Sequence, residues 1–272
     1  MPSALRDFHH QLSGPENGPR WVFLHGLMGF RNNWGKIIAG LDRTERCLAY
    51  DQRGHGRSMK PDSGYAPEDY ANDLHDILNE LRWDKVTLVG HSMGGRNALN
   101  FCVRFPERVE RFVLEDIGPE GRPGNLEYYQ ELLGLVPTPF PNRAAARAFF
   151  SGEFLERART RDNPKMLAEY FYANMEEKPD NTVSWRFSPQ AVLESVREGQ
   201  DRDRWDEWKA LRVPTLLIRG EKSRELSAET YEKMLSLQPM IHGVVIPQAG
   251  HWVHADQPEA FLHALRGFAG LS

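Results

Sequence analysis

The sequence has few cysteines and no excess of charge of either sign. Cys47 and Cys102 are the only cysteines among 272 residues. This argues against a disulfide-stabilised secreted fold, and we expect two reduced thiols in the core. Lys and Arg total 34 against 38 for Asp and Glu, a formal net charge of −4. This balance lacks the basic footprint of a protein that binds nucleic acid or an anionic membrane.

Long apolar runs are also missing. No run approaches the roughly 18 residues of a membrane-spanning helix. Residues 1–7 lack the basic start and the apolar stretch of a secretory signal. We therefore expect a cytoplasmic protein that does not bind membranes. Hydrophobic residues still make up 40% of the chain, enough for a sizeable core, and the length suits one α/β domain that carries an insertion.

Short apolar runs recur along the chain, and each is followed by a turn and a helical pattern. The runs lie at 21–24, 47–50, 86–89, 112–114, 215–218 and 244–246. They are continuously apolar rather than alternating, which is typical of parallel strands covered on both faces. Strand and helix alternation of this kind predicts an α/β fold with a doubly wound, mostly parallel sheet. Residues 4–12 could add an antiparallel edge strand.

The alternation stops between about Gly118 and Trp208, where no clear strand is recognisable. Asn163-Pro164 and Ser188-Pro189 each offer an N-cap followed by proline in the first helical turn. We therefore expect a core domain of residues 1–117 and 209–272 with a helical cap inserted at 118–208. This insertion holds 13 of the 29 aromatic residues. Most should fill a small core, and some could line a ligand cavity at the junction.

A nucleophilic serine is predicted by the five residues Gly90-His91-Ser92-Met93-Gly94. They directly follow the apolar run at 86–89 and precede a helix-like stretch. The Gly-x-Ser-x-Gly pattern between a strand and a helix makes a strained turn that exposes the serine hydroxyl. The alternative interpretation is a glycine-rich structural turn.

A serine hydroxyl needs a base to take its proton, and His251 is the best candidate of ten histidines. It follows the run at 244–246 and the loop at 247–250, so it belongs at the carboxyl end of a strand, where catalytic groups gather in such sheets. His254 is expected to pack or to face solvent. His242 precedes the run and belongs at the opposite edge of the sheet.

The orienting acid has two possible positions. Asp116 follows the run at 112–114, and the alternatives Glu221 and Glu225 follow the run at 215–218. Position 223 between these two glutamates is a serine, which cannot stabilise an imidazolium as a carboxylate does. Asp116 is favoured because it stands at a strand end and Gly118-Pro119 then turns the chain away. Its alternative role is to cap the beginning of the insertion.

The oxyanion hole needs two backbone N–H groups. One is expected from Met93, the residue after the nucleophile. The second is expected from Leu27, with Met28 as the alternative, because Gly26 and Gly29 allow an amide of this loop to turn inward. His25 is expected to support the same turn by hydrogen bonding. The sequence shows no phosphate loop, metal-type histidine pair or cysteine cluster, so we expect no cofactor and no metal.

Four motifs in this order carry a resemblance to a known superfamily. They are His25-Gly26-Leu27-Met28-Gly29, Asp51-Gln52-Arg53-Gly54-His55-Gly56-Arg57-Ser58, Gly90-His91-Ser92-Met93-Gly94-Gly95 and Gly250-His251-Trp252. The chain resembles the α/β-hydrolase superfamily, and within it the small bacterial esterases of the YbfF type and the mammalian abhydrolase-domain esterases. The resemblance implies a helical cap. It also implies an acid after the strand that follows the nucleophile helix, which supports Asp116.

Together these features predict a serine hydrolase that cleaves carboxylic esters of small to medium acyl chains through Ser92, Asp116 and His251. The expected partner is a small-molecule ester, with no nucleic acid and no membrane, and the oligomeric state stays open. The alternatives are a carbon–carbon bond hydrolase of the diketone type, or a lactonase or thioesterase with the same triad. A non-enzymatic ligand sensor of the same fold is a further alternative.

Overall fold

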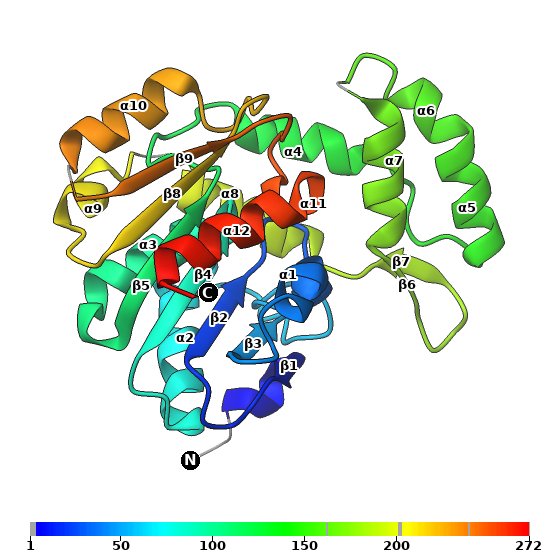
Figure 1. Ribbon diagram of the computed structural model, residues 1–272. Coiled ribbons are helices and arrows are strands. Elements are labelled where there is room, and N and C mark those ends of the chain that lie inside the picture. Colours follow the sequence, from blue (N-terminus) through cyan, green and yellow to red (C-terminus); the bar gives the residue numbers. More distant parts are fainter. Residues whose placement is uncertain (1–3, 162, 201–202, 239, 272) are drawn as a thin grey trace.

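A seven-stranded sheet forms the centre of the protein in the computed structural model, which describes residues 4–161, 163–200, 203–238 and 240–271 (Figure 1). The strand order is β1-β3-β2-β4-β5-β8-β9, and β1 alone pairs antiparallel. The strands are β1 (His10–Ser13), β2 (Arg20–Leu24), β3 (Arg46–Tyr50), β4 (Val86–His91), β5 (Val109–Glu115), β8 (Thr215–Gly220) and β9 (His242–Ile246). Every apolar run of the sequence lies inside one of the parallel strands, so the expected α/β fold is confirmed.

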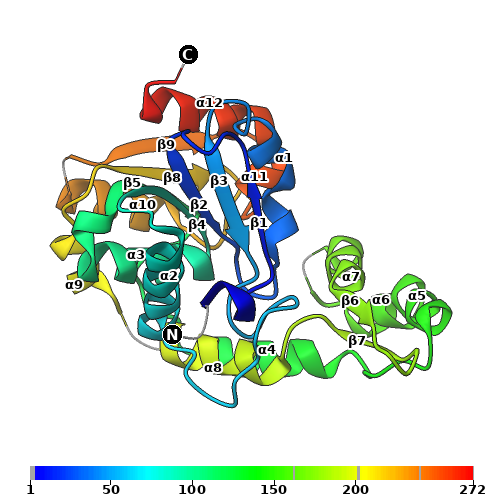
Figure 2. The same cartoon turned by 90° about the horizontal axis from the view of Figure 1, so that it is seen from below.

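Helices cover both faces of the sheet (Figure 2). One face carries α2 (Pro67–Leu81), α3 (Met93–Arg104), α9 (Trp205–Ala210) and α10 (Ala228–Leu237). The other face carries α1 (Gly35–Ala39), α11 (Val253–Asp256) and α12 (Pro258–Ala269). Strand β2 contributes side chains to both layers. Val22 and Leu24 pack against the face with α2 and α3, and Trp21 and Phe23 pack against the face with α1 and α12. Successive side chains of a strand point to opposite faces, so an unbroken apolar run fills both layers.

The two edges of the sheet differ from the expected pattern. The sequence predicts an antiparallel strand over residues 4–12, but Ala4–Asp7 forms a 3-10 turn and the strand begins at His10. Phe8, between the two, is buried and its ring lies 5.5 Å from that of Tyr50. At the opposite edge, β9 is largely exposed. Coverage on both faces therefore holds for the inner strands and not for β9.

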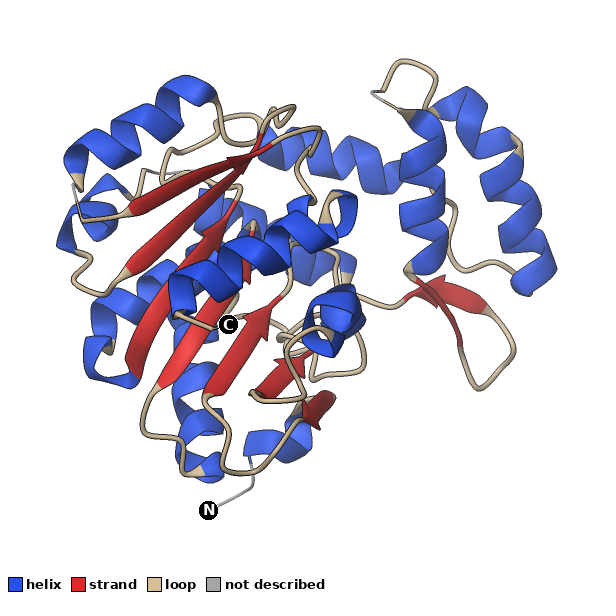
Figure 3. Cartoon of the chain, in the orientation of Figure 1, coloured by secondary structure: helices blue, strands red, loops and turns tan. Residues whose placement is uncertain are grey.

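The segment between β5 and β8 is mainly helical (Figure 3). It forms α4 (Asn125–Gly134), α5 (Arg143–Ser151), α6 (Glu153–Arg157), α7 (Pro164–Ala173) and α8 (Pro189–Gln200). Both predicted caps are present, because the Asn163 side chain accepts from the Met166 amide and the Ser188 hydroxyl from the Ala191 amide. In Figure 1, α5, α6 and α7 project to one side of the sheet.

The sequence reasoning was wrong in expecting no strand in this segment. Strands β6 (Met175–Glu177) and β7 (Val183–Trp185) pair antiparallel as a separate small sheet. Three residues each are too few for a periodic pattern to be recognisable. Buried Met175, Val183 and Trp185 hold this pair against the aromatic core of the segment.

Helix α9 crosses position 208, where the insertion was expected to end. Trp208 is fully buried in the main core, and its indole N–H donates to the Met234 carbonyl oxygen at 3.0 Å. This helix therefore packs with the sheet. Helices α4 to α8 share a different cluster, which also takes in Leu27, Met28, Tyr65, Tyr70 and Met93.

Two further features follow from the described residues. Within them, no helix combines the length and the apolarity that crossing a bilayer requires. Cys47 and Cys102 are free and buried, and burial raises the pKa of both thiols. They behave as small apolar side chains of the core, as the sequence indicates.

The core of the insertion can be tested at Phe154, which is fully buried between Phe150 at 5.3 Å and Phe171 at 5.7 Å. Phe154→Ala should lower the free energy of unfolding of the insertion by about 3–5 kcal/mol, because it leaves a cavity among the rings. Urea denaturation with hydrogen exchange resolved by peptide measures this. The control Met240→Ala removes an exposed side chain and should change little. A loss equal to that of the control would contradict the packing described.

Candidate active site

Ser92 occupies a strained turn between β4 and α3. Its backbone has φ 53° and ψ −120°, a conformation that L-residues rarely adopt. A Cβ at Gly90 would lie 2.5 Å from the Gly94 carbonyl oxygen, and one at Gly94 would lie 2.5 Å from the carbonyl oxygens of Leu24 and His25. Only glycine therefore fits on either side, which is the physical reason for the Gly-x-Ser-x-Gly spacing.

Backbone hydrogen bonds fix the two ends of this turn. The Ser92 amide donates to the Glu115 carbonyl oxygen of β5 at 3.1 Å, and the Ser92 carbonyl accepts from the Arg96 amide at 3.1 Å. Ser92 thus stands at the N-terminus of α3, where the peptide dipoles favour negative charge. Met93 is the first residue of this helix.

His251 stands on the loop after β9, next to α11. Its Nδ1 donates to Asp116 Oδ2 at 2.9 Å. A neutral imidazole with a proton on Nδ1 carries its acceptor lone pair on Nε2. Ser92 and His251 line one cavity of about 350 Å³. The structure thus brings together the serine, the histidine and the aspartate that the sequence analysis selected from distant segments.

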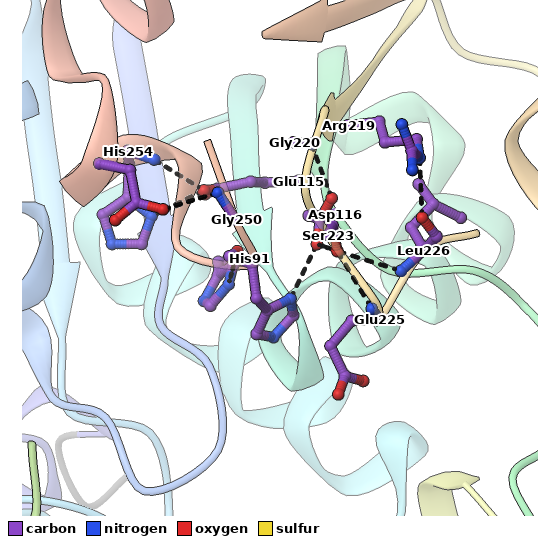
Figure 4. Close-up of polar contacts among 12 residues, drawn as sticks. His91, Glu115, Asp116, Arg219, Gly220, Ser223, Glu225, Leu226, Gly250 and His254 are labelled. Atoms are coloured by element: carbon purple, nitrogen blue, oxygen red, sulfur yellow. Dashed lines mark hydrogen bonds and ion pairs between the residues drawn. The ribbon is translucent and has the colours of Figure 1, made fainter. Parts of the chain in front are cut away.

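Asp116 is fully buried and directly follows β5, with a left-handed φ of 52°. Its Oδ1 accepts from the Gly220 amide at 2.8 Å, and its Oδ2 accepts from the Ser223 hydroxyl (Figure 4). The same Oδ2 also accepts from Nδ1 of His251. These donors satisfy a carboxylate that burial would otherwise make costly.

The two alternative acids have other partners. Glu221 Oε2 accepts from the Gln248 amide at 2.8 Å. Glu225 forms an ion pair with Arg122, whose guanidinium also donates to the Glu225 carbonyl oxygen. Glu225 is nevertheless one of the residues that line the cavity around Ser92.

Sequence reasoning missed the role of Ser223. It treated this serine only as a missing carboxylate, whereas the hydroxyl donates to Asp116 and accepts from the Glu225 amide at 3.1 Å. An acid at 116 combined with a serine at 223 is a pattern that could have predicted this bond. A second carboxylate at 223 would repel the one at 116, whereas a hydroxyl donates to it.

A second carboxylate–imidazole pair lies beside the first. Glu115 and His254 are both buried, and Glu115 accepts from the Nδ1 of His254 at 2.8 Å and from its backbone amide at 2.9 Å (Figure 4). The Nε2 of His91 donates to the His251 carbonyl oxygen at 2.9 Å. These bonds hold α11 and the loop of His251 against the ends of β4 and β5.

One nitrogen or oxygen from each of His91, Glu115 and His254 lies within 4.8 Å of the others, so this group could be considered as a metal site. The hydrogen bonds just described already engage Nε2 of His91 and Nδ1 of His254. Burial, together with the neighbouring His251 and His254, lowers the pKa of His91 well below its ordinary value, so the ring is neutral. The geometry is that of a structural hydrogen-bonding cluster.

The loop after β2 forms another wall of the cavity, through Leu27 and Met28. A Cβ at Gly26 would lie 2.7 Å from Nδ1 of His91, and Met28 has a left-handed φ of 60°. The hydroxyl of Tyr170, from α7, donates to the Leu27 carbonyl oxygen at 2.9 Å. Burial raises the pKa of Tyr170, which keeps this donor protonated. The sequence held no signal for this bond across 143 positions.

His25 holds the same loop from behind. Its Nδ1 donates to the Gly26 carbonyl oxygen at 2.8 Å, and its Nε2 accepts from the Gln52 amide at 3.0 Å. Burial lowers the pKa of His25 to about 4, so this neutral ring keeps one donor and one acceptor. Asp51 Oδ1 also accepts from the Arg31 amide at 2.7 Å. The loop at 51–58 therefore supports the loop of Leu27 through both contacts.

A mostly parallel sheet whose central strand ends in this serine turn defines the α/β-hydrolase class of proteins. The chain belongs to the α/β-hydrolase fold family, which matches residues 19–258.

Known relatives are similar over nearly the whole chain. A 2-(acetamidomethylene)succinate hydrolase of Mesorhizobium japonicum is 28% identical, over 93% of this chain and 88% of its own length. Esterase YbfF of Escherichia coli is 27% identical, over 91% of both. A solved marine microorganism esterase has a TM-score of 0.81 and 25% identity, covering 96% of this chain and 99% of that one. The resemblance to small bacterial esterases is thus confirmed.

The support of Asp116 can be tested at Ser223. Ser223→Ala removes a donor from a fully buried carboxylate, so the free energy of unfolding should fall by about 1–3 kcal/mol at neutral pH. Urea denaturation measures this change. The matched control Ser236→Ala removes an exposed hydroxyl bonded to the Lys233 carbonyl oxygen, and it should change stability by less than about 0.5 kcal/mol. Equal losses in the two variants would contradict a stabilising role of Ser223.

Proposed function

We propose that this protein is a cofactor-independent serine hydrolase that cleaves carboxylic esters of small to medium acyl chains. The observation that carries the proposal is the bond from His251 Nδ1 to buried Asp116, together with the cavity that His251 and Ser92 both line. The bond leaves Nε2 of His251 as a base, and a base beside a strained serine is what acyl transfer requires.

In the proposed reaction, Ser92 Oγ attacks the ester carbonyl carbon while Nε2 of His251 accepts the hydroxyl proton. The bond to the alcohol oxygen then breaks, and His251 returns the proton to that oxygen. The acyl-enzyme is hydrolysed by a water that gives a proton to His251, and Ser92 Oγ regains it as the acid leaves. Asp116 keeps the imidazole in the useful tautomer and stabilises its positive charge.

The negative charge of the tetrahedral intermediate needs donors that are fixed in advance. We propose the amide of Met93, at the N-terminus of α3, and the amide of Leu27, with Met28 as the alternative. The Leu27 amide shares a peptide plane with the Gly26 carbonyl oxygen, which accepts from His25 Nδ1 at 2.8 Å and from the Gly29 amide at 3.0 Å, and these bonds support Leu27. The bond from Tyr170 to the Leu27 carbonyl oxygen fixes the next peptide plane, which carries the Met28 amide. We also propose that residues 118–208 act as a cap over Ser92, because α4 and α7 supply much of the wall of its cavity.

The names of two relatives favour ester cleavage, because YbfF and the marine protein are both called esterases. The Mesorhizobium relative is named for a succinate derivative. Among the described residues that line the cavity of Ser92, Glu225 is the one Asp, Glu, Lys or Arg side chain. A carboxylate next to the scissile bond would face it, which favours an uncharged group at that position. Thioesters, lactones and diketones would use the same triad.

The nucleophile is tested by Ser92→Ala. This variant removes the attacking oxygen, so kcat/KM for p-nitrophenyl butyrate should fall by about 10⁴-fold or more. Spectrophotometric assay measures the rate, and circular dichroism checks that the variant is folded. A fluorophosphonate probe should label the wild type and not the variant. A folded variant with the wild-type rate would refute the proposal.

The acid is tested by Asp116→Asn. An amide cannot hold His251 in the same tautomer, so kcat should fall by about 10²–10⁴-fold. Glu221→Gln is the matched control, because Glu221 contacts the Gln248 amide and is not part of the cavity lining. Glu225→Gln tests the other alternative acid. Full activity of Asp116→Asn, with loss of activity in either glutamate variant, would move the acid to that glutamate.

A further inference from the structure

Two cavities adjoin between the sheet and the insertion. The inner cavity, of about 350 Å³, holds Ser92 and His251. The outer cavity, of about 320 Å³, contains neither of them. Both are lined by the same four side chains, which are those of Tyr128, Leu167, Tyr170 and Trp252. These four side chains therefore border both cavities, and a ligand occupying both would lie against them.

The two cavities carry opposite charge. Glu225 lines the inner cavity, and its partner Arg122 does not line it. Among the described residues that line the outer cavity, the one charged side chain is that of Arg161, which lies with Thr160 and Met166. An anionic group close to the ester bond would face a carboxylate, whereas an anionic group farther away would face a guanidinium.

Arg161 is held in position for such a contact. Its guanidinium lies 5.1 Å from the centre of the Tyr128 ring, and Nη2 donates to Glu131 Oε2 at 2.8 Å. Glu131 is largely exposed and does not line the cavity, so this ion pair contributes little binding energy. The ion pair uses one of the several N–H donors of the Arg161 guanidinium, a planar group whose geometry matches that of a carboxylate. The ring and the ion pair reduce the number of positions that the side chain samples.

We propose that the outer cavity is a substrate subsite for a carboxylate carried at the end of the substrate distant from the scissile ester bond, and that Arg161 binds it. The proposal rests on the proposed ester hydrolysis and adds a substrate class to it: an ester with an uncharged segment next to the reacting carbonyl and an anionic end. Tyr128, Leu167, Tyr170 and Trp252 contact the uncharged segment.

The test is a matched series of p-nitrophenyl esters. One set has acyl chains of increasing length that end in a methyl group, and the other has chains of the same length that end in a carboxylate. For the wild type, the ratio of kcat/KM for the anionic ester to that for the neutral ester should be lowest for the shortest chain. It should rise with length once the carboxylate reaches Arg161. A second series of esters carries the carboxylate on the alcohol instead of the acyl chain, and pH-stat titration measures its hydrolysis. Comparing the two series shows whether the acyl end or the alcohol end of the substrate occupies the outer cavity.

Variants of Arg161 assign the effect to its charge. Arg161→Met keeps an unbranched side chain near Tyr128 but removes the guanidinium, so the anionic-to-neutral ratio for the long esters should fall about tenfold, the size of one charge-assisted hydrogen bond. Arg161→Lys should restore part of the ratio. Arg159→Gln is the matched control, because Arg159 is an exposed neighbour outside both cavities, and it should leave the ratio unchanged. Glu225→Gln should raise the ratio for the shortest ester.

The possible outcomes separate this proposal from the proposed function. Hydrolysis of neutral esters with no rise of the ratio, or with a rise that Arg161→Met leaves intact, would overturn the subsite alone. If no ester of either series is hydrolysed, the proposed function itself fails. A rise that disappears in Arg161→Met and persists in Arg159→Gln would support the subsite.

Discussion

The buried carboxylate of Asp116 is the interaction on which the arrangement of the site depends. It accepts from the Gly220 amide, the Ser223 hydroxyl and Nδ1 of His251, and so joins the ends of β5 and β8 to the loop after β9. A buried charge without such donors would be strongly destabilising. Folding therefore favours the arrangement in which these loops converge on Asp116. Gly220 permits this convergence, because a Cβ there would lie 2.1 Å from the Gly250 carbonyl oxygen.

Strands β4 and β5 end in the same way. Each is followed by a residue with left-handed φ, Ser92 after β4 and Asp116 after β5. The last residue of each strand then anchors the segment around His251: His91 donates to the His251 carbonyl oxygen, and Glu115 accepts twice from His254. The strain at Ser92 and Asp116 is thus balanced by buried hydrogen bonds of their neighbours in the chain. His251 is thus held at its backbone by His91 and at its ring by Asp116.

Much of this arrangement is readable in the sequence because it depends on local patterns. Continuous apolar runs indicate inner parallel strands, and glycines on both sides of Ser92 are required where a Cβ would meet backbone within 2.5 Å. The choice of Asp116 over Glu221 and Glu225 came from strand ends and from the serine at 223. Ser223 itself, Glu115 and Tyr170 were missed, since their partners lie more than 100 positions away in the chain. The pair β6–β7 was missed because strands of three residues carry no period.

The insertion is fixed to the core at both of its ends, which bears on how the cavity keeps its shape. Arg96 of α3 is buried and donates to the Gly199 carbonyl oxygen at 2.7 Å and to the Glu120 carbonyl oxygen. Burial, with Arg122 nearby, lowers the pKa of Arg96 to about 10, which still leaves it charged at neutral pH. Tyr170 adds a third attachment through the Leu27 carbonyl oxygen. A rotation of the insertion as a rigid body would have to break bonds at all three points. These three attachments therefore oppose opening of the cavity at Ser92 by movement of the whole insertion.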